Sequence, residues 1–391
     1  MDGSSGPAPA GRDGSVREVA LLFLKLGTIG FGGPAAHIAL MREEVVRRRG
    51  WVADQRFIDL IGVTNLIPGP NSTELAIHLG YERARWRGLV TAGVCFIVPA
   101  MLIVLGLAWA YVEYGETPAV EGVLYGIKPI VVAIIVMALF GLFRTAVKGP
   151  LLAGVAVAVL LAYLLGVNEL LLLVLGALVV MSVRTLGSWW GESGGVHGTT
   201  LPILLAAALP VFSDASTGQL TRLFLTFLKI GAVLYGSGYV LLAFLRGDFV
   251  ERLGWLTQEQ LLDAVSIGQV TPGPVFTTAT FVGYVVAGFP GAVLATVGIF
   301  LPSFLFVALI TRIVDHIRDR PWSAALLDGA NAAALALMAG VTAQLGRDAL
   351  VDPLTAGLAV VAGLLLWRTR LNSAWYIAVG AAIGAAATLF R

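Results

Sequence analysis

Two Pro-Gly-Pro triplets, Pro68-Gly69-Pro70 and Pro272-Gly273-Pro274, interrupt strongly apolar parts of the chain. Proline inside a helix removes a hydrogen bond and costs about 3 kcal/mol, so a repeated break needs a reason. A helix that restarts after such a break has an electropositive N-terminus whose free amides bind anions. The triplets therefore predict an anion site, with a tight packing turn as the alternative. The amides expected there belong to Ser72 and Thr73, after the capping residue Asn71, and to Phe276 and Thr277.

Further candidates lie close to the triplets or at matching places in the two halves of the chain. Lys25 and Lys229 occupy equivalent positions inside apolar segments, where a charged side chain is usually functional. The alternative is that each lysine extends to the membrane interface. Residues 30–34, Gly-Phe-Gly-Gly-Pro, form another break, which either aims a helix N-terminus inward or bends the chain. The side-chain amides of Asn65 and Gln269 would hydrogen bond a ligand or complete the turns. Lys128 is expected at the interface, since its counterpart is Asn331.

Glu74 and His78 are the candidates for carrying a proton. They lie one helical turn apart, so a carboxyl–imidazole pair would be able to pass a proton. The second half has Thr278 and Val282 at these positions, so such a relay would exist once. The competing interpretation is that Asn71 and Glu74 form a capping box. The sequence leaves both interpretations open.

The elements that must position these residues are membrane helices. Of 391 residues, 58% are hydrophobic and 13% are charged, against roughly 25% charged in a soluble domain. Residues 88–112 and 264–311 contain no charged side chain, and about 20 apolar residues suffice for one span. The alternation typical of a membrane β-barrel is absent. We therefore expect an all-α polytopic membrane protein.

Composition also argues against several other classes of protein. The single cysteine, Cys95, allows no internal disulfide, and four scattered histidines show no metal-ligand spacing, so neither a metal nor a cofactor is expected. The net charge of +2 is too small to indicate nucleic acid, and no phosphate-binding loop is present. An enzyme would need a nucleophile with its base, or metal ligands, inside the spans, and neither pattern is found. The sequence favours a transporter over an enzyme.

The chain is an internal duplication. A shift of 204 residues aligns residues 23–27 with 227–231 and the first triplet with the second. After a one-residue deletion, a shift of 203 aligns Pro99 with Pro302 and Arg144 with Arg347. This predicts a disordered tail (1–14), a first repeat (15–184), a linker (185–216) and a second repeat (217–391). Ser15 to Glu18 is interpreted as a capping box that opens the first helix.

The charges of the loops indicate that the two repeats are inverted in the membrane. Basic loops prefer the cytoplasm. The loop at 83–87 carries three arginines and its counterpart at 286–290 has no charge, whereas the acidic loop at 113–121 has a basic counterpart at 312–320. We expect about ten transmembrane helices, two re-entrant Pro-Gly-Pro half-helix hairpins and both termini outside. The five spans of the first repeat are predicted at residues 16–31, 88–112, 122–143, 150–166 and 169–183, with residues 34–49 on the cytoplasmic surface.

Four segments carry a resemblance to a known family. FLKLGTIGFGGPAAHI and GWVADQRFIDLIGVTNLIPGPNSTELAIHLGY in the first half, with FLKIGAVLYGSGYVL and QVTPGPVFTTATFVGY in the second, resemble the chromate ion transporter family of the long two-domain type. The likeness covers nearly the whole chain except the tail and the linker. It implies a duplicated inner-membrane protein that exports chromate and confers chromate resistance. The motif positions that it carries over are Gly32, Gly33, Pro34, Pro68, Gly69, Pro70, Asn71 and Glu74, and then Gly236, Gly238, Pro272, Gly273 and Pro274.

The expected partners are a chromate or sulfate-like dianion and the lipid bilayer, without nucleic acid and with a homodimer left open. Half-helix N-termini near lysines suit a small tetrahedral dianion but do not separate chromate from sulfate. The resemblance alone favours chromate. The expected function is a secondary transporter in the bacterial inner (plasma) membrane. The alternatives are a carrier of sulfate or another small anion, and a passive anion channel.

Overall fold

The computed structural model describes residues 15–65, 67–115, 117–189, 218–234, 240–317, 321–369 and 371–389. Every element within these ranges is helical, as the composition predicts. The predicted tail, Gly236, Gly238 and most of the linker lie outside them. In the first half the elements are α1 (Val16–Ile29), α2 (Gly33–Met41), η1 (Arg42–Arg48), α3 (Asp54–Thr64), α4 (Asn71–Tyr114), α5 (Pro118–Ala146), α6 (Pro150–Leu164) and α7 (Glu169–Trp189). In the second half they are α9 (Gln219–Val233), α10 (Leu241–Leu245), η3 (Arg246–Arg252), α11 (Gln258–Val270), η4 (Val275–Thr277), α12 (Thr278–Ile317), α13 (Pro321–Ala349), α14 (Pro353–Arg368) and α15 (Ser373–Leu389).

Four of the described helices are long and apolar enough to cross a membrane. They lie at Asn71–Tyr114, Val120–Arg144, Val275–Thr311 and Ala324–Ala349, and shorter apolar helices accompany them at Pro150–Leu164, Pro353–Arg368 and Ser373–Ala387. A hydrocarbon core satisfies no backbone hydrogen bonds, and helices satisfy theirs internally. The fold is that of a polytopic helical membrane protein.

The two longest helices, α4 and α12, each reverse direction. The reversal in α4 falls at Ala84 and Arg85, and Arg85 has a φ of +50°. After it the halves of α4 lie together so closely that a Cβ on Gly80 would be 2.3 Å from the Gly88 carbonyl oxygen. In α12 the reversal is at residues 287–288, and the Thr280 hydroxyl lies 2.7 Å from that of Thr296. Each is therefore a helical hairpin, with its turn in the loop that the sequence places between two apolar segments.

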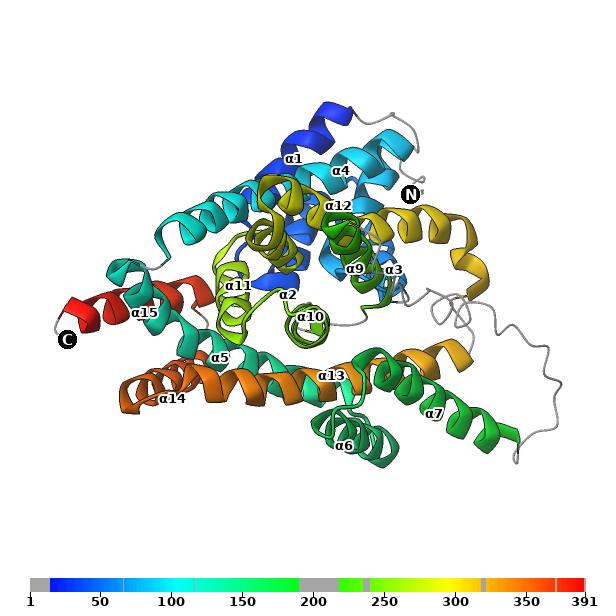
Figure 1. The fold of residues 1–391 in the computed structure, drawn as a ribbon. Helices are drawn as coiled ribbons and strands as arrows, with labels where there is room; N and C mark the ends of the chain where they lie inside the picture. Colours follow the sequence, from blue (N-terminus) through cyan, green and yellow to red (C-terminus); the bar gives the residue numbers. More distant parts are fainter. Residues whose placement is uncertain are drawn as a thin grey trace.

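The helices form a central body and a layer beside it. In the body, α1 packs on α4, α9 packs on α12, and α4 packs on α12. The layer contains α5, packed on α13, α14 and α15, while α13 also packs on α6 and α7. Figure 1 shows α1, α4, α9 and α12 in the upper part, with α5, α13 and α14 crossing below them. The body carries both Pro-Gly-Pro turns.

Some predicted helix boundaries need correction. Ser15 precedes α1 as predicted, but its side chain makes no capping hydrogen bond, so the capping box at 15–18 is not formed. Instead the amide of Glu18 donates to the backbone carbonyl of Ser15 at 2.9 Å. The predicted surface segment 34–49 is divided between α2 and the π-helical turn of η1 and runs back beside α1, since Glu44 pairs with Lys25. Met41 and Val45 in this segment are buried, as its apolar pattern indicates. Arg83 lies 2.7 Å from Glu18, so the start of α1 lies beside the loop at 83–87 and not on the opposite face, where the expected outside N-terminus requires it.

Candidate functional site

Each Pro-Gly-Pro turn binds the end of a helix from the other half of the chain. The amide of Gly69 donates to the carbonyl of Leu234 at 2.8 Å, and the amide of Gly273 donates to the carbonyl of Gly30 at 2.8 Å. Gly30 follows α1 and Leu234 follows α9, where terminal carbonyls lack partners within the helix. The two hydrogen bonds are related by the same 204-residue shift as the sequence repeat. The two halves therefore interlock at the breaks.

Glycine is required at both turns. Gly69 has a φ of +134° and Gly273 a φ of +91°, a region that side-chain-bearing residues rarely adopt. Gly32 and Gly33 also have positive φ angles, so the predicted second break, between α1 and α2, is present. Pro34 follows in the first turn of α2, where its missing amide costs nothing.

The helix start after the first break differs from the expectation. Pro70, not Asn71, is the capping residue of α4, and the Asn71 side chain donates instead to the Asn65 side-chain oxygen at 2.7 Å. The amide of Thr73 donates to the Pro70 carbonyl at 2.7 Å, so it is not free. In the second half, the amide of Thr277 is likewise bound, to the carbonyl of Pro274. The first-turn amides that remain as anion donors are those of residues 71–72 and 275–276.

Glu74 is fully buried beside the first turn. No backbone group donates to its carboxyl oxygens within the described chain, so the capping box with Asn71 does not form. The Ser303 hydroxyl faces the carboxyl group. A Cβ on Gly69 would lie 2.2 Å from Glu74 Oε1 and 2.7 Å from that hydroxyl. Thr73 Oγ1 and His78 Nε2, which lie in the same helix as Glu74, are also buried and have no hydrogen-bond partner in the described chain. Burying polar groups without hydrogen bonds costs free energy, so this cluster beside the first turn is a candidate for binding a ligand or a proton.

A histidine that sequence reasoning missed joins the two turns. His37 Nε2 lies 2.8 Å from the Gly30 carbonyl, and its Nδ1 lies 3.3 Å from the Ser72 hydroxyl. Since a carbonyl only accepts, Nε2 donates to it and Nδ1 accepts from Ser72. The Gly30 carbonyl also accepts from Gly273, so one hydrogen-bonded path runs from the start of α4 to the second turn.

The two turns differ in polarity. Ser303, which was also missed, faces the first turn, whereas its sequence counterpart Ala100 faces the second, 2.7 Å from a Cβ built on Gly273. His37 has the counterpart Leu241, and Glu74 has Thr278. No signal in one sequence marks Ser303, because its proximity to Gly69 arises only from packing between the halves. The titratable groups are therefore gathered at the first turn.

Lys25 and Lys229 form matching ion pairs. Lys25 lies 2.6 Å from Glu44 and Lys229 lies 2.6 Å from Asp248. Arg48 and Arg252 make the second contact to the same two carboxylates. The hydrogen bond from Lys25 lowers the pKa of Glu44 below its ordinary value of 4.5, so the carboxylate is charged at neutral pH. These ion pairs thus join α1 to η1 and α9 to η3, and a carboxylate compensates the charge of each lysine.

Another ionic cluster joins α5 to α11. Lys128 lies 3.1 Å from the buried Asp263 and 2.8 Å from Glu259, which is 74% exposed, and the Tyr111 hydroxyl donates to Asp263 at 2.9 Å. Lys128 is therefore paired with two carboxylates, one buried and one exposed. Gln269, the predicted ligand contact beside the second turn, lies half-buried in the last turn of α11.

The fold is that of a polytopic membrane protein whose two related halves interlock at the breaks. The chain belongs to the chromate transporter family, whose profile matches residues 17–181 and again residues 221–385. It is 35% identical to the chromate transport protein of Cupriavidus metallidurans, over 94% of this chain and 92% of that one. It is 32% identical to the probable chromate transport protein of Synechococcus elongatus, over 90% of each chain. It is also 32% identical to the chromate transport protein of Pseudomonas aeruginosa, over 90% of this chain and 87% of that one.

No solved structure matches this chain. Members of the family are membrane transporters and not enzymes. Family membership and the apolar helices together make this chain a multi-pass protein of the inner membrane.

Proposed function

We propose that the chain is a secondary transporter that exports chromate across the inner membrane and thereby confers chromate resistance. Support for the substrate comes from the family and from relatives named as chromate transport proteins that align over at least 90% of this chain. Export rather than uptake is part of the proposal. Chromate and sulfate share shape and charge, so a sulfate carrier and a passive anion channel are the alternatives that experiments must separate.

The architecture proposed for this transporter is a pair of inverted repeats, residues 15–184 and 217–391. Ten spans and two re-entrant hairpins at the Pro-Gly-Pro turns complete it. Support comes from the reversed charge of matching loops and from the reciprocal hydrogen bonds of Gly69 and Gly273. In transporters of this architecture, substrate sites lie near the midplane, where broken helices from the two repeats meet.

The proposed anion site lies between the two turns. Its donors are the first-turn amides of α4 and of the helix that begins at Val275, each at an electropositive helix end. The side chains of Asn65, Asn71 and Gln269 lie beside these turns and supply further donors. Gly32, Gly33 and Pro34, with Gly236 and Gly238 outside the described residues, complete the backbone of the site. Lys25 and Lys229 contribute positive charge that Glu44 and Asp248 keep partly compensated.

Glu74 is the proposed proton carrier, with His78 one helical turn away as its relay. The observation that carries this assignment is the fully buried carboxyl group, which within the described chain faces the neutral hydroxyl of Ser303 and no cation, at the glycine where the backbone breaks. Intramembrane carboxylates of this kind mark proton relays in carriers. A proton bound at Glu74 removes a buried charge, and a dianion bound nearby favours that proton through attraction. The proton and the dianion would therefore bind and cross together with a net negative charge, and the inside-negative membrane potential would drive their export.

The test of the transport function uses intact cells. Cells that produce the chain should accumulate less chromate and survive higher chromate concentrations than cells carrying an empty vector. The comparison is made at high and at low sulfate, because sulfate competes for chromate entry through sulfate uptake systems. Increased accumulation would show an uptake carrier instead. If the chain changes the accumulation of labelled sulfate but not that of chromate, it is a sulfate carrier.

A further inference from the structure

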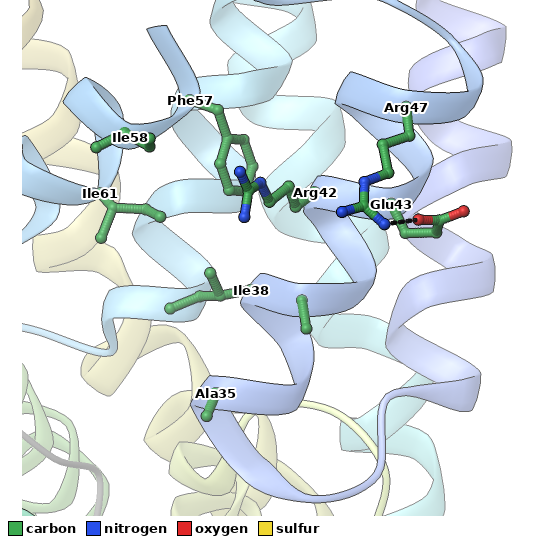
Figure 2. Close-up of a pocket in the computed structure, with 9 residues that line it drawn as sticks. Ala35, Ile38, Arg42, Glu43, Arg47, Phe57, Ile58 and Ile61 are labelled. Carbon is green, nitrogen blue, oxygen red and sulfur yellow. Dashed lines mark hydrogen bonds and ion pairs between the residues drawn. The ribbon is translucent and has the colours of Figure 1, made fainter. Parts of the chain in front are cut away.

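A groove between α2–η1 and α3 is not used by the proposed transport site. It encloses about 360 Å³, and Ile38, Phe57, Ile58 and Ile61 form its apolar floor. Arg42, Glu43 and Arg47 lie at one end. Figure 2 shows Arg42 extending from η1 toward Phe57, with Arg47 and Glu43 side by side beyond it. The groove is thus apolar along its length and charged at its mouth.

The second half of the chain fills the equivalent surface with its own helices. Leu242, Leu261 and Leu262, the counterparts of Ile38, Phe57 and Ile58, are at most 3% exposed. They are covered because α13 packs on α10, and α5 and α13 both pack on α11. In the first half Phe57 is also fully buried, but Ile58 is 48% exposed and Ile38 is half-buried. Within the described chain, the same apolar surface is therefore covered in one repeat and partly open in the other.

The mouth of the groove is suited to phosphate. Arg42 gives two of its five N–H donors to Asp54, at 2.8 and 2.7 Å, and keeps the others. Arg47 is 69% exposed and makes a 3.3 Å contact with Glu43. Its counterpart in the second half, where the surface is filled, is Glu251. Guanidinium groups bind phosphate through paired hydrogen bonds. The N–H donors that Arg42 and Arg47 do not give to Asp54 and Glu43 are the ones available to a phosphate.

Aromatic and basic residues gather where η1 ends and at the reversal of α4, as is typical of a membrane interface. Arg49, which directly follows η1, and Arg83 lie over the Trp51 ring at 5.6 and 5.2 Å. Tyr81 and Trp86 stack edge to face with ring centroids 5.2 Å apart. Tyrosine and tryptophan concentrate at lipid headgroup level, and arginine at the cytoplasmic side.

We propose that this groove binds one anionic phospholipid. Its phosphate lies between Arg42 and Arg47, and one acyl chain lies along Ile38, Ile58 and Ile61. The cytoplasmic leaflet carries anionic lipid and attracts basic segments near its surface. A free phosphate would satisfy only the arginines and leave the apolar floor exposed, so the groove is specific for a lipid.

The experiment measures lipid binding to the full-length protein in detergent by native mass spectrometry. Phosphatidylglycerol and phosphatidylcholine with identical acyl chains are titrated separately. We expect one phosphatidylglycerol to bind more tightly than phosphatidylcholine. The double variant Arg42→Gln/Arg47→Gln should weaken that binding by about tenfold or more. The matched control is Arg144→Gln/Arg347→Gln, which removes the same charge from exposed positions on α5 and α13, away from the groove, and should leave the binding unchanged.

A second variant tests the apolar floor without touching a charge. Ile58→Trp should fill the groove and displace phosphatidylglycerol, and because Ile58 is half-exposed the larger ring needs little repacking. The proposal is overturned if the tryptophan variant binds phosphatidylglycerol as the unchanged protein does. It is overturned equally if the control double variant weakens binding as much as the groove variant, or if phosphatidylcholine binds as tightly.

Discussion

At the scale of single residues, Glu74 is the side chain on which the proposed mechanism depends. Its position in the first turn of α4 is that of an ordinary capping acid, and a capping acid would accept a backbone hydrogen bond. It accepts none in the described chain and lies against Gly69 and Ser303. A cap is needed only for helix stability, whereas a buried acid without a cationic partner at a helix break is suited to taking up and releasing a proton.

Glu74→Gln should separate proton coupling from anion binding. Glutamine keeps the size and polarity of the side chain but cannot carry a proton, so proton-driven chromate transport should be lost while chromate–chromate exchange persists. Both activities are measured in sealed vesicles, and the dependence of the exchange on pH should also become weaker. Glu113→Gln, on an exposed acid of the same helix, is the control. Proton-driven transport at the normal rate by Glu74→Gln would remove Glu74 from the mechanism.

Gly69→Ala should reduce stability and transport far more than the control substitution Gly62→Ala. The new Cβ would clash with Glu74 Oε1 at 2.2 Å, and the φ of +134° would be strained by about 1–3 kcal/mol. We expect a lower melting temperature in detergent and loss of transport. Gly62→Ala, in α3, has no atom within 4 Å of its new Cβ and should be neutral or stabilising. Equal behaviour of the two variants would show that the Gly69 position tolerates a side chain.

At the scale of elements, the sequence predicted the breaks but not what they bind. Two prolines around one glycine forbid a continuous helix, so the turn between α3 and α4 follows from local chemistry. The hydrogen bonds of Gly69 to Leu234 and of Gly273 to Gly30 join segments far apart in the chain. So do the contacts of Ser303 and His37. Contacts of this kind arise from packing between the repeats, and a single sequence carries no local signal for them.

Replacing Pro68 and Pro70 together with alanine should abolish transport while leaving the protein in the membrane. Alanine favours helix, so α3 and α4 would tend to join across the turn. The hydrogen bond from Gly69 to Leu234 would then be lost. Chromate transport is compared with that of Pro150→Ala, which changes a proline in the first turn of α6. A double variant that inserts normally and still transports chromate at the normal rate would make the break a packing turn.

At the scale of the whole molecule, the two repeats are alike in backbone and unlike in chemistry. The helical hairpins and the lysine ion pairs occur twice, at positions related by the sequence repeat. Glu74, His37 and Ser303 occur once. In the proposed mechanism, the duplicated backbone supplies two helix ends for a dianion, and the divergence of one copy supplies the proton site. Two similar helix ends for the anion and a single proton site are therefore compatible in one chain.

The inverted arrangement predicts opposite labelling of matching loops. In a Cys95→Ala background, cysteines placed singly at Arg85 and at Phe289 should react with a membrane-impermeant thiol reagent from opposite sides. Arg85 lies at the reversal of α4, and Phe289 lies beside the equivalent reversal of α12 and is 60% exposed. Reaction of both cysteines from the same side would mean parallel repeats and would remove the basis for a site at the midplane.

The most direct test of proton-coupled chromate transport measures chromate flux in proteoliposomes containing only this protein. Chromate is supplied at equal concentration on both sides, and a proton gradient is then imposed with the membrane potential clamped. We predict that chromate accumulates against its own gradient on one side, that a protonophore abolishes the accumulation, and that Glu74→Gln does not accumulate it. Chromate that only equilibrates, with or without the proton gradient, would contradict proton coupling and show a passive channel.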